Sequence, residues 1–209
     1  MFKYRIPSFI QKLFYSYTWK VKTSDKLLFL TFDDGPHPEI TPWVLAQLKQ
    51  YQAKATFFCV ADNVRKYPQI YAQIIQEGHS VGNHTYHHKN GWHTQSADYL
   101  ADVALAEKYI QSNLFRPPYG KIKNAQARFL LNQYAIVMWS HLSCDYSKSL
   151  NLQESLLAMR NIQAGSILVF HDSQKAWPNL QQLLPQLLPY YAQNGFDMKA
   201  LSKEICEWK

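Results

Sequence analysis

The chain has 209 residues, of which 47% are hydrophobic and 18% charged, and its formal net charge at pH 7 is +7. This length and apolar content support one domain with a substantial core and exclude a second large domain. The three cysteines (Cys59, Cys144 and Cys206) are widely spaced and form no CxxC pair, so neither a disulfide framework nor a structural zinc site is expected.

The first 26 residues are basic and rich in aromatic side chains. They contain six Lys or Arg and one Asp, which is five of the seven net positive charges. Polar residues interrupt any stretch of signal-peptide length, so no signal peptide is recognised and a cytoplasmic location, or one peripheral to the inner membrane, is expected. We predict that residues 1–25 pack on the domain through a short helix, with a peripheral membrane contact as the alternative. The apolar residues at helical spacing are Phe9, Ile10, Leu13, Phe14 and Tyr17.

From residue 27 onward, short apolar runs alternate with amphipathic stretches. The runs typical of strands are 27–33, 55–60, 80–83, 114–116, 135–139, 166–170 and 196–200. The stretches with helical periodicity are 42–51, 67–77, 97–112, 124–132, 152–162 and 180–193. This repeated β-then-α pattern predicts an α/β fold, a distorted and incomplete (β/α) barrel with about seven parallel strands.

The first predicted strand ends in two adjacent carboxylates, Asp33 and Asp34, within the sequence TFDDGP at 31–36. When two carboxylates share one cleft, their repulsion raises the pKa of one of them. A bound cation would stabilise the charged forms, and an acid/base role in catalysis would also explain the pair. The pair therefore predicts a site of chemistry at the end of this strand.

A second polar cluster, at 84–88, reads H-T-Y-H-H. His84 and His88 are four residues apart, so one turn of helix or a tight loop can aim both imidazoles at one point. Two imidazoles and one carboxylate form a common ligand set for catalytic Zn²⁺. A merely solvated histidine-rich loop is the alternative, and the aspartate pair argues against it.

Arg116 and His171 also follow apolar runs. A lone Arg is usually a surface charge, and a lone His is usually half-buried with its hydrogen bonds satisfied. Here Asp33, Asp34, Arg116 and His171 all stand at or just past the end of a predicted strand, and in a barrel of parallel strands that end is where active sites are built.

Four motifs in chain order carry a resemblance to a known family. TFDDGP at 31–36, H-T-x-x-H at 84–88, R-P-P-Y-G at 116–120 and L-x-x-H at 168–171 resemble motifs one, two, three and five of the polysaccharide deacetylases, the NodB-like carbohydrate esterase family 4. The resemblance covers residues 26–209, the expected catalytic domain. It implies a metal-dependent hydrolase that removes N-acetyl groups from N-acetylhexosamine-containing glycans, such as chitooligosaccharides or peptidoglycan, and releases acetate. An O-acetyl carbohydrate esterase and a non-catalytic carbohydrate-binding protein are the alternatives.

The resemblance also implies roles for individual residues. Without it, the sequence does not determine which of the two aspartates binds the metal and which is the base. By analogy, Asp34, His84 and His88 hold a divalent metal, Zn²⁺ in the first place, with Co²⁺ or Ni²⁺ as alternatives. Asp33 is the general base, Arg116 its charge partner and His171 the acid. The Tyr119 backbone N–H would stabilise the oxyanion, and Leu168 would line the pocket for the acetyl methyl group.

The chain departs from the family at motif four, which usually has two aspartates three apart, followed by Trp. Here the first Asp is Leu142, the second is kept as Asp145, and the Trp is Tyr146. We expect Asp145 to accept a hydrogen bond from His171 and raise its pKa, and we expect Tyr146 to affect substrate choice. The expected partner is an acetylated saccharide and not nucleic acid, because the basic charge is local and no nucleic-acid-binding module accompanies it. The sequence does not determine the oligomeric state.

Overall fold

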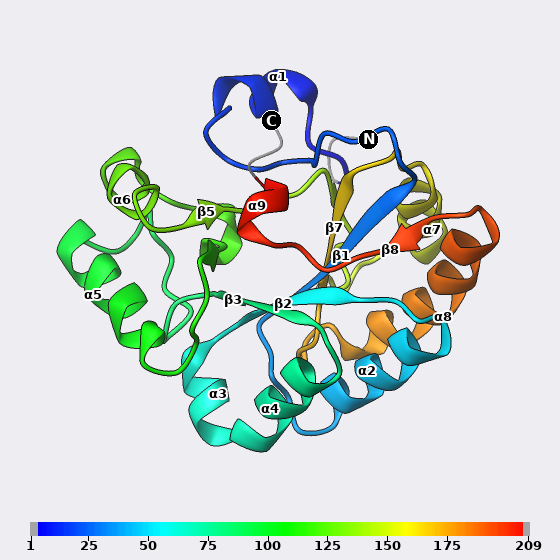
Figure 1. Cartoon of the computed structure of the whole chain (residues 1–209), viewed down its shortest axis with the longest axis horizontal. Coiled ribbons are helices and arrows are strands. Elements are labelled where there is room, and N and C mark those ends of the chain that lie inside the picture. The colour runs from blue at the N-terminus through cyan, green and yellow to red at the C-terminus, as the bar shows by residue number, and fades with distance from the viewer. Residues whose placement is uncertain (1–3, 207–209) are drawn as a thin grey trace.

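The computed structural model describes residues 4–206 and has one main sheet, which curls into an incomplete barrel with helices around it (Figure 1). The strand order is β5-β4-β3-β2-β1-β7-β6, and β8 pairs with β1 outside this path. All of these strand pairs are parallel. The predicted α/β incomplete barrel is therefore confirmed.

The elements have the following bounds. The strands are β1 (Leu27–Asp33), β2 (Ala55–Cys59), β3 (Ser80–Asn83), β4 (Leu114–Phe115), β5 (Ala135–Ile136), β6 (His141–Leu142), β7 (Ser166–His171) and β8 (Asp197–Met198). The helices are α1 (Ser8–Leu13), α2 (Ile40–Gln50), α3 (Ala61–Lys66), α4 (Pro68–Gln76), α5 (Ser96–Glu107), α6 (Asn124–Leu130), α7 (Leu152–Arg160), α8 (Trp177–Gln193) and α9 (Lys203–Cys206), with a short 3-10 helix, η1, at Pro118–Gly120.

All seven predicted strands and all six predicted helices are present, with bounds that differ by a few residues. The sequence did not predict β6, α3 or α9. Two residues cannot show a periodicity of their own, and β6 exists because His141 and Leu142 pair with Leu168 and Val169 of β7. No helix within residues 4–206 is long and apolar enough to span a bilayer.

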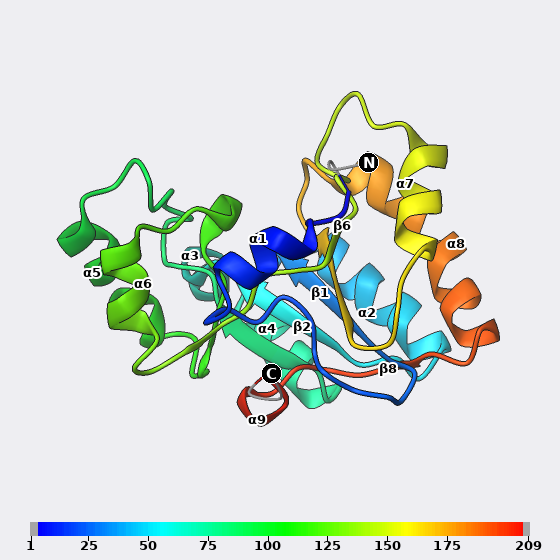
Figure 2. The ribbon, with the colours of Figure 1, turned by 90° about the horizontal axis from the view of Figure 1, so that it is seen from above.

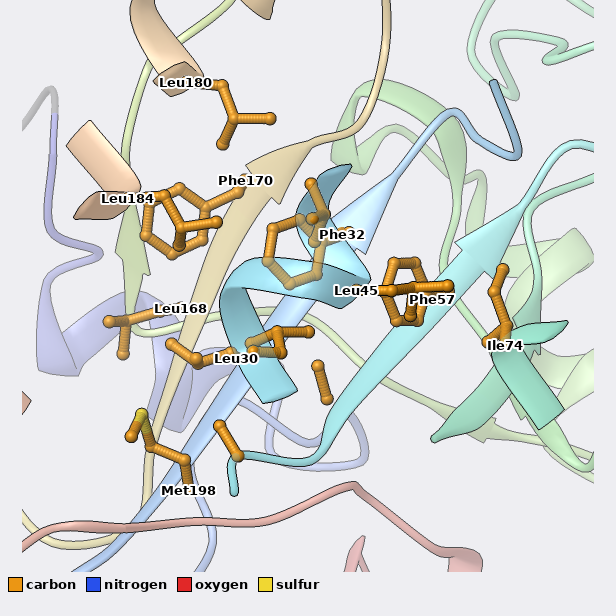
Figure 3. Packing of buried hydrophobic residues seen from close by; sticks show 14 of the residues in the cluster. Leu30, Phe32, Leu45, Phe57, Ile74, Leu168, Phe170, Leu180, Leu184 and Met198 are labelled. Carbon is orange, nitrogen blue, oxygen red and sulfur yellow. The ribbon is translucent and has the colours of Figure 1, made fainter. Parts of the chain in front are cut away.

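Side chains of the central strands alternate between the helices and the barrel interior. Leu30 and Phe32 of β1, with Leu168 and Phe170 of β7, belong to the buried cluster that packs against α2 and α8 (Figure 3). Burying one such side chain contributes about 1.5–3 kcal/mol. The alternate positions of the same strands face inward, because successive residues of a strand point to opposite faces. Polar residues near the strand ends are thereby held inside the barrel.

The N-terminal segment lies across the open edge of the barrel, between β5 and β6 (Figure 2). The Ile6 N–H donates to the Ser140 carbonyl at 3.0 Å, and the Leu142 N–H donates to the Tyr4 carbonyl at 2.8 Å. Further along, the Thr18 N–H donates to the Ile136 carbonyl at 2.8 Å. Tyr17 and Trp19 are buried in a cluster that also holds side chains of α5 and α6. The described part of the segment thus covers backbone groups that the incomplete barrel leaves open.

Candidate active site

Strand register brings the polar residues of the distant motifs to one rim of the barrel. Asp33 of β1 lies directly beside His171 of β7. Asn83 of β3 pairs with Phe115 of β4, so the next residues, His84 and Arg116, leave their strands together. These strand ends border a cleft of about 500 Å³. Its lining includes Asp33, Asp34, His84, His88, Tyr119, Gly120, Lys121, Trp139, Leu142, Tyr146, Val169, His171 and Lys175.

Asp34, His84 and His88 form a cluster whose ligand atoms all lie within 4.8 Å of one another. The Asp34 Oδ1 is 3.1 Å from the His88 Nε2 and 3.7 Å from the His84 Nε2. Burial disfavours the ionised form of Asp34, but the hydrogen bond from His88 and the positive charge of His171 outweigh it, so the pKa of Asp34 is well below its ordinary value. Burial also lowers the pKa of His84 to about 4, which keeps its imidazole neutral. A carboxylate and neutral imidazoles are the forms that bind a metal.

The tautomer of His84 suits a ligand role. Its Nδ1 lies 2.8 Å from the carbonyl oxygen of Arg116. A carbonyl oxygen only accepts, so Nδ1 carries the proton and the lone pair of Nε2 is directed at the cluster. The donor set therefore fits a borderline divalent metal such as Zn²⁺.

The loop that carries the two histidines is not a helix. Thr85 and His88 have φ values of 64° and 55°, and Asp34 and Tyr119 on the neighbouring loops have values of 80° and 60°. Such left-handed conformations cost free energy for residues other than glycine and gather at functional sites. Of the two local structures that the His84–His88 spacing allowed, the tight loop is the one present.

Arg116 forms a buried ion pair with Asp33. Its Nη1 lies 2.7 Å from the Asp33 Oδ1 and donates to the Thr31 hydroxyl at 2.7 Å. Its Nε and Nη2 donate to the carbonyl oxygens of Val137 and Met138. The guanidinium is fully buried and holds the Asp33 carboxylate at the wall of the cleft.

His171 is held by Asp145 at the end of β7. The His171 Nδ1 donates to the Asp145 Oδ1 at 2.7 Å, and the His171 backbone N–H donates to Oδ2 at 2.8 Å. Burial would lower the pKa of His171, but the charge and hydrogen bond of Asp145 raise it to about 9. Tyr146 packs edge-on against the His171 ring, with centroids 5.1 Å apart. The Asp145 pair therefore favours the protonated form of the His171 imidazole.

One further carboxyl group, not identified from the sequence, shapes the aspartate loop. Asp172 is fully buried, and its Oδ1 accepts from the Gly35 N–H at 3.1 Å while its Oδ2 accepts from the Thr41 hydroxyl. Burial raises the pKa of Asp172 to about 8. A Cβ at Gly35 would lie 2.1 Å from the Asp172 carboxylate, so position 35 needs glycine for this close approach.

Leu168 does not line the cleft, which corrects the role that the resemblance implied for it. Its side chain is fully buried with Leu30 and Leu184 on the helix side of the sheet (Figure 3). Val169 lines the cleft instead, because residues two apart on a strand share a face and Val169 is two before His171. The alternation of side chains between the two faces of a strand, counted back from His171, would have identified Val169 from the sequence.

Tyr119 and His87 complete the placement of the motif residues. The Tyr119 ring packs against His88, with centroids 4.6 Å apart, and Tyr119 lines the cleft. His87 points away from the cluster, where its Nδ1 donates to the Asp102 Oδ1 at 2.6 Å. The structure thus gathers the Asp34 cluster, both acid/base candidates and Tyr119 around one cleft and leaves out His87.

The sequence profile described as Polysaccharide deacetylase matches residues 20–139, more than half of the chain. The chain therefore belongs to this family.

Individual relatives match over most of the chain. A peptidoglycan-N-acetylglucosamine deacetylase of Bacillus cereus is 31% identical over 92% of this chain and 93% of its own length. A chitooligosaccharide deacetylase of Azorhizobium caulinodans is 31% identical over 73% of this chain and 77% of its own. The crystal structure of a peptidoglycan N-acetylglucosamine deacetylase has a TM-score of 0.82 and 30% identity, with 94% of this chain and 97% of that chain covered.

Proposed function

We propose that this protein is a metal-dependent hydrolase that removes N-acetyl groups from an N-acetylhexosamine-containing glycan and releases acetate. The observation that carries the proposal is the meeting, in one cleft, of a three-residue cluster of metal-ligating side chains, a buried carboxylate paired with Arg116, and a histidine hydrogen-bonded to Asp145. Amide hydrolysis needs these three components, namely a Lewis acid, a base and an acid.

Asp34, His84 and His88 would hold the metal. When bound there, a divalent ion such as Zn²⁺ lowers the pKa of a coordinated water and polarises the acetyl carbonyl. The water oxygen adds to the acetyl carbon, and Asp33 takes the proton that this oxygen loses. Arg116 would orient Asp33, because its Nη1 donates to the Asp33 Oδ1 at 2.7 Å.

His171 would complete the reaction by donating a proton. Its Nδ1 is bonded to Asp145, which leaves Nε2 to deliver a proton to the sugar nitrogen. The C–N bond then breaks, the amine stays on the sugar and acetate leaves with the oxygen of the water. The Tyr119 backbone N–H would donate to the tetrahedral oxyanion. Tyr146 and the apolar wall formed by Val169 and Leu142 would border the acetyl group and the sugar.

The substrate class is inferred from the relatives, whose names specify N-acetylglucosamine of peptidoglycan and chitooligosaccharides. We infer that residues 26–209 act on a glycan of this chemistry. The fold by itself does not decide between turnover and binding, because a carbohydrate esterase family 4 pseudoenzyme of Bacillus anthracis shares it with a TM-score of 0.73 at 24% identity, over 91% of this chain and 69% of that chain.

The test is acetate release from chitooligosaccharides, peptidoglycan fragments and O-acetylated xylan, with and without a chelator. We expect release from the N-acetylated sugars, loss of release with chelator and recovery when Zn²⁺ is restored. Release from the O-acetylated substrate alone would instead assign an esterase. A folded, zinc-loaded protein that releases no acetate from any of them would favour the carbohydrate-binding alternative.

A further inference from the structure

An apolar surface is exposed on α1 and the turn that follows it. Phe9, Leu13 and Tyr15 are 66%, 71% and 78% exposed, and Phe14 beside them is 37% exposed. Nine large hydrophobic residues are exposed in residues 4–206, and these four fall within seven consecutive positions. Single exposed apolar side chains are normal on a protein surface, whereas a cluster marks an interaction site. We call Phe9, Leu13, Phe14 and Tyr15 the α1 patch.

The α1 patch is held outward by the packing of the opposite side of the segment. Ile6 and Ile10 pack against the buried cluster that contains Tyr17 and Trp19. The Trp19 indole N–H donates to the Phe14 carbonyl at 2.9 Å, which fixes the turn after α1. The patch is therefore a feature of the folded domain.

Positive charge accompanies the patch along the N-terminal segment. Arg5, Lys12, Lys20 and Lys22 are exposed, and residues 4–24 contain no Asp or Glu. A cavity of about 550 Å³ opens beside α1, and its described lining includes Arg5 and Lys20 but no acid. Aromatic and aliphatic side chains bordered by Lys and Arg are typical of surfaces that enter the headgroup region of a bilayer.

We propose that the α1 patch docks on an anionic lipid bilayer, with its four side chains at headgroup depth and the neighbouring cations on acidic headgroups. Charge complementarity favours an anionic bilayer as the partner, because each Lys or Arg near such a bilayer strengthens the attraction between the protein and the membrane. A second copy of the chain would face the patch with the same cations. Nucleic acid would use the cations but would leave aliphatic Leu13 without a fitting partner.

The experiment is co-sedimentation of the full chain with vesicles of phosphatidylcholine alone or mixed with phosphatidylglycerol, at low and physiological salt. The apolar test variant is Phe9→Ser/Leu13→Ser/Tyr15→Ser. Its control is Ile75→Ser/Phe129→Ser, whose side chains are 49% and 61% exposed on α4 and α6. The charge variant is Lys12→Gln/Lys20→Gln, matched by Lys49→Gln/Lys108→Gln, which removes the same charge from other exposed sites.

We expect binding to the anionic vesicles that weakens with salt. The apolar variant should lower the partition coefficient by at least about tenfold and the charge variant by roughly tenfold, while both controls bind as the wild type does. Melting temperatures verify folding, and acetate release from a soluble oligosaccharide should be unchanged in every variant because none of these residues lines the cleft. A failure of membrane binding would thus leave the proposed hydrolase intact.

Three results would overturn the proposal. The first is a wild-type protein that does not sediment with anionic vesicles even at low salt. The second is an equal loss of binding in the Ile75→Ser/Phe129→Ser control. The third is a concentration-dependent dimer that the apolar variant dissociates, in the absence of vesicle binding, which would assign the patch to a second copy of the chain.

Discussion

Arg116 is the most constrained side chain of the site, since Asp33 is its partner carboxylate and its other donors bond to a hydroxyl and two carbonyls. Asp33→Asn removes the proposed base and also leaves a buried guanidinium without its counter-charge. We expect turnover to fall by roughly 10² to 10⁴ and the free energy of unfolding to fall by about 3–5 kcal/mol. Acetate release and urea denaturation measure the two effects.

Asp62→Asn is the matched control for this prediction. Asp62 pairs with Lys66 and Arg65 on the exposed surface, where an ion pair contributes at most about 1 kcal/mol. Its loss should leave activity unchanged. An Asp33→Asn protein that keeps wild-type turnover would remove Asp33 from the base role.

Alanine substitutions can distinguish the proposed metal ligands from the neighbouring His87. His84→Ala and His88→Ala each remove one of three ligands and should lower both zinc content and activity. His87→Ala removes a side chain that is bonded to Asp102 outside the cluster and should leave zinc content unchanged. Zinc is measured by elemental analysis after reconstitution and desalting. Equal zinc content in all three variants would contradict the assigned ligand set.

The pair of Asp145 and His171 predicts a pH dependence. Asp145 raises the pKa of His171 to about 9, so the proton needed for the leaving nitrogen is present below that pH and is lost above it. Asp145→Asn keeps the shape but removes the charge. The alkaline limb of the activity profile should therefore move to lower pH.

Asp102→Asn is a suitable control, because Asp102 bonds His87 in a second aspartate–histidine pair outside the cleft. It should leave the position of the alkaline limb unchanged. An unshifted limb in Asp145→Asn would mean that another group sets it.

At the scale of elements, the N-terminal segment completes an edge that the strands leave open. Deleting residues 1–18 removes several backbone hydrogen bonds to the 136–142 region and the buried Tyr17 side chain. With about 1 kcal/mol for each net hydrogen bond and about 1.5–3 kcal/mol for a buried side chain, the melting temperature should fall clearly. Phe9→Ser/Leu13→Ser, which alters only exposed positions of the same segment, should leave it nearly unchanged. Equal melting temperatures of the deletion and the full chain would show that the segment adds no stability.

At the scale of the whole molecule, metal binding should stabilise the fold. The proposed ligands come from the ends of β1 and β3, which meet only in the folded state. At free zinc about 100 times the dissociation constant, mass action adds about 2.7 kcal/mol, or roughly 5 to 10 °C in melting temperature for a chain of this size. Thermal scans with zinc and with chelator measure the shift. His84→Ala should abolish it and His87→Ala should retain it, and no shift in the wild type would count against a metal site.

Much of the fold followed from local patterns. The apolar runs located seven of the eight strands. A strand that is buried on both faces has a short run of apolar residues, and this run is visible in the sequence without knowledge of the strands that pair with it. The motif residues were recognisable because they stand immediately after those runs. β6 was not recognisable, since its two residues pair only through their register with β7.

The sequence by itself determined which chemical groups are available, their order along the chain and the family to which they belong. Tertiary structure decided which of them meet. It put His84 and His88 on a loop with left-handed residues, placed Asp145 against His171, assigned the cleft wall to Val169 and not Leu168, and set one side of α1 against the barrel while its aromatic side faces outward. These outcomes depend on strand register and on contacts between residues far apart in the chain, which local sequence patterns do not encode.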